Sequence, residues 1–174
     1  RKMLPEKMKL TGDKPYKTKD IQLILKNTTN LKFRCLIHFL SASGVRIGSF
    51  ETMKLKHLED MSNDCKSVLV YDDDKSEYHT FIHHEAVEAL DEYLAYRTRL
   101  GEKITPDSWV IPSTSDSNKP VTTASITTQM NRFARQNLVQ EKKRGRYEIQ
   151  ACHGFRKRFD TILKSNYNVN IKDR

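Results

Sequence analysis

Two short arginine motifs contain the residue types of this chain that are best suited to chemistry. The first is the segment 41–48 (SASGVRIG), which contains Arg46, and the second is the segment 153–156 (HGFR), which ends at Arg156. A guanidinium keeps its charge at any working pH, and its forked donors match the oxygens of a phosphate. Arg46 and Arg156 could therefore hold one phosphate from two sides.

A lysine and a histidine could add the proton transfers that a phosphate reaction needs. Lys75 lies between two strand-forming segments, and His153 lies three positions before Arg156, so these two share a helix face. To break a phosphodiester and keep its bond energy, an enzyme uses a protein nucleophile, fixed cations and a general acid. Two arginines, one lysine and one histidine suit a version of this chemistry without a metal ion.

The elements that must position these residues can be predicted from apolar spacing and capping residues. One helix is expected to begin near Thr18 or Asp20, and a second after Asn30 with Phe33, Leu36, Ile37 and Leu40 on one face. Gly44 is expected to end this second helix, and a short helix is expected over 47–54. Arg46 would then lie in the junction between two helices.

The middle of the chain predicts a small sheet. Residues 67–71 and 77–82 are rich in β-forming residues and flank a polar tip, and a third strand is expected near 56–60. Further helices are expected over 84–100, over 123–137 and from His153 onward. The predicted fold class is therefore mostly α with a small antiparallel β-sheet (α+β).

The charge of the chain is unevenly distributed. The net charge is +9, but residues 57–116 contain 5 Lys and Arg against 14 Asp and Glu, whereas residues 132–158 contain 9 against 2. A basic surface is typical of proteins that bind polyanions, although a solvated surface without a ligand gives the same composition.

Eight basic residues around the second motif are candidate contacts to DNA phosphates. Such contacts position a protein on DNA without reading its sequence. They comprise two residues of the helix predicted over 123–137, four of a predicted loop, and two neighbours of the second motif: Arg132 and Arg135, then Lys142, Lys143, Arg144 and Arg146, then Lys157 and Arg158.

Length and composition exclude several classes of protein. The 174 residues suit one domain, and we expect residues 1–17 to be a linker or N-terminal extension and residues 18–174 to be the domain. No apolar run approaches the roughly 18 residues of a membrane span. Cys35, Cys65 and Cys152 form no closely spaced pair, so we expect reduced thiols and no metal site. The chain begins with Arg1, and we expect it to be a piece of a longer protein.

Both motifs resemble those of one known family. The segment 43–48, with Met53, Lys54 and Leu58 after it, resembles the first arginine box of the tyrosine recombinases, the phage integrase family. The segment 153–159 (HGFRKRF) resembles the second box, most closely in its archaeal or archaeal mobile-element members. The hairpin around Lys75 lies where the family has a lysine between two strands. The resemblance covers residues 18–174.

The resemblance implies the catalytic-domain fold of tyrosine recombinases and their chemistry. Such enzymes perform site-specific recombination, cutting and rejoining DNA through a 3′-phosphotyrosine link. Arg46 and Arg156 would hold the scissile phosphate, Lys75 would protonate the leaving oxygen, and His153 would assist proton transfer and contact the phosphate. The resemblance also implies no cofactor, double-stranded DNA as the partner, a homotetramer on two DNA sites, no membrane association, and a cytoplasmic, nucleoid-associated protein.

The sequence departs from the family pattern in three places. The family's nucleophilic tyrosine lies well beyond the second arginine, whereas Tyr167 is only 11 positions after Arg156. We therefore expect the nucleophile beyond residue 174 and no cleavage by this piece alone. Ser49 stands where the family often has an acidic residue. The aspartates at 72–74 would repel phosphate next to Lys75.

Three other functions remain open. The chain could be an integrase-like module that binds DNA without cutting it, which the acidic hairpin favours. It could be a type IB topoisomerase, which the resemblance allows because that enzyme shares fold and chemistry with the recombinases. A helix-turn-helix repressor fits less well, because no tight helix pair with a recognition helix is visible.

Overall fold

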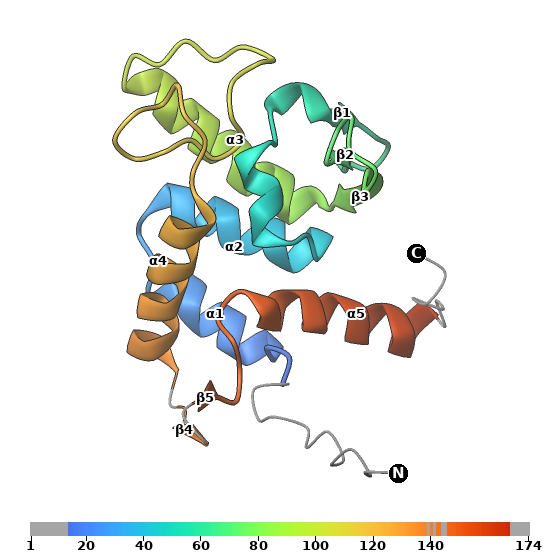
Figure 1. The fold of residues 1–174 in the computed structure, drawn as a ribbon, viewed down its shortest axis with the longest axis vertical. Helices are drawn as coiled ribbons and strands as arrows, with labels where there is room; N and C mark the ends of the chain where they lie inside the picture. The colour runs from blue at the N-terminus through green and yellow to red at the C-terminus, as the bar shows by residue number, and fades with distance from the viewer. Residues whose placement is uncertain (1–13, 139, 141, 144–145, 168–174) are drawn as a thin grey trace, which may run out of the picture.

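The computed structural model describes residues 14–138, 140, 142–143 and 146–167 (Figure 1). The helices are α1 (Thr18–Lys26), α2 (Leu31–Ser43), α3 (His84–Arg99), α4 (Thr123–Asn137) and α5 (His153–Tyr167), with two 3₁₀ helices, η1 (Ile47–Glu51) and η2 (Leu55–His57). The strands are β1 (Leu58–Asp60), β2 (Lys66–Val70), β3 (Tyr78–Ile82), β4 (Lys142–Lys143) and β5 (Arg146–Tyr147). None of the helices among these residues is long and apolar enough to span a bilayer.

Helix α2 is the centre of the molecule, with α3 and the sheet on one side and α5 on the other (Figure 1). It begins where sequence predicts, because the side chain of Asn30 accepts a hydrogen bond from the backbone N–H of Phe33. Its buried residues point in several directions, which is typical of a helix enclosed on all sides. They are Phe33, Cys35, Leu36, Ile37, Phe39, Leu40, Ala42 and Ser43.

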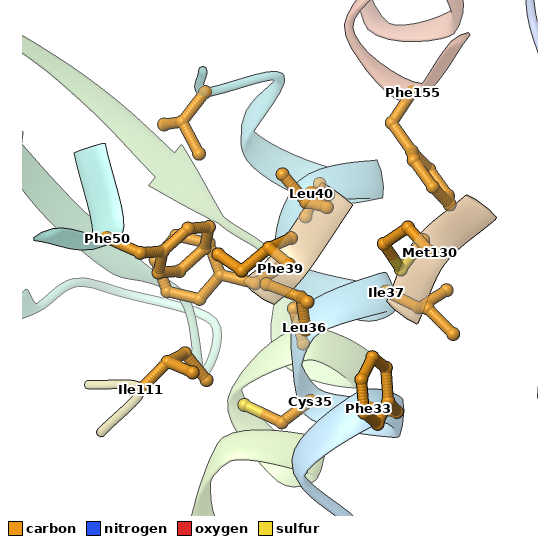
Figure 2. Packing of buried hydrophobic residues seen from close by; sticks show 14 of the residues in the cluster. Phe33, Cys35, Leu36, Ile37, Phe39, Leu40, Phe50, Ile111, Met130 and Phe155 are labelled. Carbon is orange, nitrogen blue, oxygen red and sulfur yellow. The ribbon is translucent and has the colours of Figure 1, made fainter. Parts of the chain in front are cut away.

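The hydrophobic core is built around these α2 side chains. The rings of Phe39 and Phe50 meet edge to face with centroids 5.3 Å apart, which attaches η1 to α2. Figure 2 shows Phe155 of α5 pointing toward Met130 of α4 beside α2. All four of these residues are at most 1% exposed. The core therefore joins α2 and η1, which flank the first arginine motif, to α5, which carries the second.

The sheet has the order β1-β2-β3 and is antiparallel throughout, as predicted. In the register, Leu58 pairs with Val68, and Val68 pairs in turn with Thr80. Tyr71 has a φ of 60° at the end of β2. This left-handed residue turns the chain out of the strand, and its ring contacts that of Tyr78.

Residue Tyr16 lies in the segment that sequence assigns to a linker or extension, yet it belongs to the core. Its side chain is 1% exposed, and its ring packs against Phe155 with centroids 4.4 Å apart. Its hydroxyl donates to the carbonyl of Ala151. The chain before α1 thus holds the start of α5 in place.

Two local predictions differ from the structure. The helix expected over 47–54 is instead η1, an extended stretch and η2, because residues 53–55 bond to the segment 108–110: Val110 N–H donates to the Met53 carbonyl and Leu55 N–H to that of Ser108. The basic run expected as a loop contains the paired strands β4 and β5. Both differences come from pairing with another stretch of chain.

Candidate active site

The first arginine motif forms a tight junction after α2. Gly44 ends the helix in the left-handed conformation, with a φ of 60°. A Cβ atom on Gly44 would lie 2.5 Å from Cδ1 of Phe159, so α5 approaches the backbone more closely than any side chain would permit. Arg46 follows two residues later as the N-cap residue of η1, with its side chain exposed.

The second motif is joined to the first by a hydrogen bond. Nη1 of Arg156 donates to the carbonyl oxygen of Gly44 over 2.8 Å. The half-buried guanidinium is thereby held next to the loop that contains Arg46, and the bond to Gly44 uses one of its five N–H donors. The structure thus brings together the neighbourhoods of the two arginines that sequence analysis paired. We call residues 43–49 and 153–159 together the arginine junction.

His153 is the first residue of α5, and its side chain is exposed on the first turn of the helix. The next residue, Gly154, permits close packing, since a Cβ there would lie 2.7 Å from Cγ2 of Ile149 and 2.9 Å from Cε2 of Tyr16. Backbone N–H groups at a helix start favour negative charge nearby. The end of α5 that carries His153 is therefore suited to a phosphate.

Lys75 lies at the hairpin tip, which we define as residues 71–77, and its side chain is exposed. Two neighbouring aspartates have structural roles. The Asp74 side chain accepts a hydrogen bond from the Ser76 N–H over 2.7 Å, and Asp72 Oδ2 lies 3.3 Å from Nε2 of buried His57. These contacts explain acidic residues in the tip without placing Lys75 against the arginine junction.

The candidate DNA contacts fall into three groups. Arg132 and Arg135 are exposed on α4, where the Arg135 guanidinium lies 5.8 Å from the ring of Tyr147. Lys157 is half-buried on α5, while Arg158 donates to the Tyr16 carbonyl and to the Thr18 hydroxyl, so it fastens the start of α1. For the basic run, only the backbone of Lys142, Lys143 and Arg146 is described, and Arg144 lies outside the described residues.

Three residues that sequence analysis did not assign to the site support the arginine junction. The Ser49 hydroxyl donates to the carbonyl of Arg46 over 2.7 Å, and the Thr80 hydroxyl donates to that of Ser43 over 3.0 Å. The carboxylate of Glu51 accepts a bond from the N–H of Thr123 at the start of α4. Of these three residues, only Ser49 could be noticed in the sequence, because it stands where the family often has an acidic residue.

A cavity of about 530 Å³ lies beside the junction, lined by Ile47 and His153 among others. The thiol of Cys152 lies in its lining. Burial raises the pKa of this thiol to about 11, so it is protonated at neutral pH and is a poor nucleophile or metal ligand. Among the described residues, no three His, Cys, Asp or Glu side chains are grouped to hold a metal ion.

The structure is a mostly helical domain with a small antiparallel sheet, in which the two arginine motifs are joined by a hydrogen bond. The sequence profile described as the Phage integrase family matches residues 16–172. The chain therefore belongs to the phage integrase family, the tyrosine recombinases, and has their catalytic-domain fold, as the resemblance predicted. No curated protein sequence matches the chain.

Solved structures support the same fold at low sequence identity. The XerA recombinase is 16% identical, with a TM-score of 0.69 over 94% of this chain and 54% of its own. The XerH site-specific recombinase, bound to difH substrate in a pre-cleavage complex, is 17% identical, with a TM-score of 0.67 over 91% and 45%. The Tn1549 transposon integrase, in complex with circular intermediate DNA, is 16% identical, with a TM-score of 0.66 over 95% and 58%. This chain thus spans about half the length of these proteins.

Proposed function

We propose that this chain is the catalytic domain of a site-specific recombinase or integrase that cuts and rejoins DNA through a 3′-phosphotyrosine. The observation that carries the proposal is the hydrogen bond from Arg156 to the Gly44 carbonyl. It places one guanidinium next to the loop of the other before any DNA binds. Cations that are fixed in advance lower a barrier more than cations that must reorganise during the reaction.

Each predicted residue has a role in this reaction. Arg46 and Arg156 hold the nonbridging oxygens of the scissile phosphate and stabilise the charge that gathers there in the transition state. Lys75 protonates the leaving 5′ oxygen once DNA brings the hairpin tip and the phosphate together. His153, three residues before Arg156, contacts the phosphate and assists proton transfer. The phosphate becomes an ester of a tyrosine, which preserves the energy for rejoining.

The nucleophile of this site is a tyrosine outside the described helices. Tyr167 is the last residue of α5, the helix that carries Arg156. It follows Arg156 by only 11 positions, whereas the family's nucleophile lies well beyond its second arginine. We therefore propose that a tyrosine beyond residue 174 attacks the phosphate held by Arg156.

The proposed substrate is duplex DNA. XerH and the Tn1549 integrase, which share the fold, have been solved with DNA. The exposed arginines of α4 lie on a helix whose residues Thr123–Asn137 include no acid, so this surface would attract a phosphate backbone. We further propose that the full protein acts as a homotetramer on two DNA sites, in the cytoplasm with the nucleoid.

The test is formation of a covalent adduct by the full-length gene product. A labelled duplex that carries the recombination site should yield a protein–DNA adduct resistant to denaturant, and mass spectrometry should locate it on a tyrosine beyond residue 174. Arg46→Ala should retain DNA binding but reduce the adduct by about 100- to 1,000-fold. Arg99→Ala is the matched control, because it removes an exposed arginine at the end of α3.

The same assay separates the proposal from its alternatives. A full-length protein that binds the duplex but forms no adduct would be a DNA-binding module that does not cut strands. The exposed acidic residues of the hairpin tip also favour this alternative. Adduct formation together with relaxation of supercoiled plasmid and no exchange between two sites would indicate a topoisomerase. Wild-type adduct yield from Arg46→Ala would contradict the assigned role of the arginines.

A further inference from the structure

The sheet reaches the arginine junction through one buried hydroxyl. Thr80 lies in the middle of β3, opposite Val68, and is 6% exposed. Its hydroxyl donates to the carbonyl of Ser43, the last residue of α2, over 3.0 Å. This bond joins the strand that follows the hairpin tip to the residue that precedes Gly44.

The bond fixes one peptide unit from both of its ends. The Ser43 carbonyl accepts from Thr80, and the Gly44 N–H of the same peptide donates to the carbonyl of Leu40 over 3.1 Å. Because a peptide unit is planar, these two bonds set its orientation. The next carbonyl along the chain, that of Gly44, is the one that receives the hydrogen bond from Arg156.

A methyl group in place of the Thr80 hydroxyl would fill the same space in the core. A valine has nearly the same shape and suits a buried strand position equally well. Burying a hydroxyl is unfavourable unless it makes a hydrogen bond, and the end of a helix leaves carbonyls that need a donor. Both needs are met by the bond to Ser43.

We propose that Thr80 is a positioning residue for the arginine pair. Through the Ser43–Gly44 peptide it holds the Gly44 carbonyl where Arg156 binds it, and it holds the start of the loop that presents Arg46. Loss of the hydroxyl would let this peptide rotate, so the two guanidiniums would no longer meet one phosphate. The inference rests on the proposed cleavage of DNA.

The first experiment compares three variants of the full-length protein by single-turnover cleavage at saturating DNA. Thr80→Val should cleave about 10- to 100-fold more slowly than wild type, with DNA affinity within about twofold. Thr80→Ser, which keeps the hydroxyl, should stay within about threefold of wild type. Thr80→Ala replaces Thr80→Val in every comparison if the valine variant does not fold.

Thr28→Val is the matched control. Thr28 is 3% exposed, and its hydroxyl donates to the Ile24 carbonyl, so this change also removes a buried hydroxyl bond at a helix end. It lies before the start of α2, and Gly44 follows the end of that helix about 20 Å away along its axis. We expect the control to lose stability as Thr80→Val does, without the loss in cleavage rate.

A second substrate distinguishes positioning from general destabilisation. Replacing one nonbridging oxygen of the scissile phosphate with a methyl group removes its negative charge, so the reaction depends less on aligned guanidiniums. The wild-type to Thr80→Val rate ratio should then fall to below about threefold. An unchanged ratio on both substrates, or normal cleavage by Thr80→Val, would overturn the inference. Absence of adduct from wild type would instead overturn the proposed function, and the inference with it.

Discussion

The arginine junction and the hairpin tip are both predicted to touch the same phosphate, yet they are held in different ways. The junction is tied by bonds to backbone carbonyls: Arg156 to Gly44, Ser49 to Arg46 and Thr80 to Ser43. The tip is held by a local bond between Asp74 and Ser76 and by the contact of Asp72 with His57, and Lys75 is exposed. The Arg156 guanidinium and the backbone at Arg46, proposed to stabilise charge, are therefore held before DNA binds, whereas Lys75, the proposed general acid, lies on a short exposed turn.

Gly44→Ala should produce the largest loss of stability, because it disrupts the close contact between Gly44 and Phe159 in the arginine junction. An added methyl would lie 2.5 Å from the Phe159 ring, at a φ of 60°. The strained backbone and the overlap together should reduce the free energy of unfolding by about 3 kcal/mol, measured by urea denaturation.

Gly101→Ala is the control for the backbone contribution. Gly101 has a φ of 88°, but a Cβ there meets no atom within 4 Å. Its loss should be about 1–2 kcal/mol, since only the left-handed conformation is affected. Equal losses at both glycines would show that α5 does not pack against the junction as closely as the structure indicates.

Lys75→Ala should produce the next largest effect, on rate and not on stability. Cleavage should slow by about 100-fold, because a general acid contributes roughly this much. The melting temperature should stay unchanged, since the side chain is exposed. A substrate with sulfur in place of the leaving 5′ oxygen should restore the rate, because a thiolate leaves without protonation.

The matched control is Lys103→Ala, which removes another exposed lysine outside the hairpin tip. It should leave the cleavage rates of the oxygen and the sulfur substrates unchanged. If Lys75→Ala cleaves the oxygen substrate at the wild-type rate, another residue is the general acid, and His153 is the candidate because it is also predicted to assist proton transfer.

Arg156→Ala and Arg46→Ala should differ in stability, although we expect both to reduce cleavage strongly. Removing Arg156 leaves the carbonyl of Gly44 without this donor, which should cost about 1–2 kcal/mol and lower the melting temperature by about 2–8 °C. Arg46 is exposed, and its removal should change stability by less than about 0.5 kcal/mol. Equal melting curves for the two variants would mean that the bond to Gly44 does not hold the junction.

The sequence predicts the elements of this fold better than their connections. Asn30 and Gly44 mark the two ends of α2 because capping depends on local backbone geometry. The break between η1 and η2 could not be predicted, since it depends on bonds from residues 53–55 to a segment about fifty positions away. Local signals fail where a distant strand or loop takes the backbone hydrogen bonds.

The same limit applies to the site. Arg46 and Arg156 could be paired from their motifs, because each motif has a distinctive composition. Thr80 carries no such signal, since a threonine in a strand is ordinary and only the tertiary fold places its hydroxyl against Ser43. Arg158 resembles a surface cation in sequence, yet it bonds to Tyr16 and Thr18.

Glu51→Gln should have the smallest effect and tests how η1 is fastened to α4. Hydrogen bonds from the Thr123 side chain and from its backbone N–H, at the start of α4, hold the pKa of the Glu51 carboxyl below its usual value. Glutamine can still accept these bonds, so the variant removes only the charge. Because Glu51 is largely exposed, solvent screening limits the loss at neutral pH to about 0.5 kcal/mol.

The pH dependence of this loss identifies its cause. A carboxyl whose pKa is lowered by folding stabilises the folded state above its unfolded pKa, and this contribution disappears as the pH falls through the folded pKa. The difference between wild type and Glu51→Gln should therefore be present at pH 7 and vanish in acid. Glu88→Gln, an exposed acid in the middle of α3, should show no such difference. If the difference in stability between wild type and Glu51→Gln persists in acid, the side chain acts through its packing. The negative charge of Glu51 at the start of α4 would then not contribute to holding η1 against that helix.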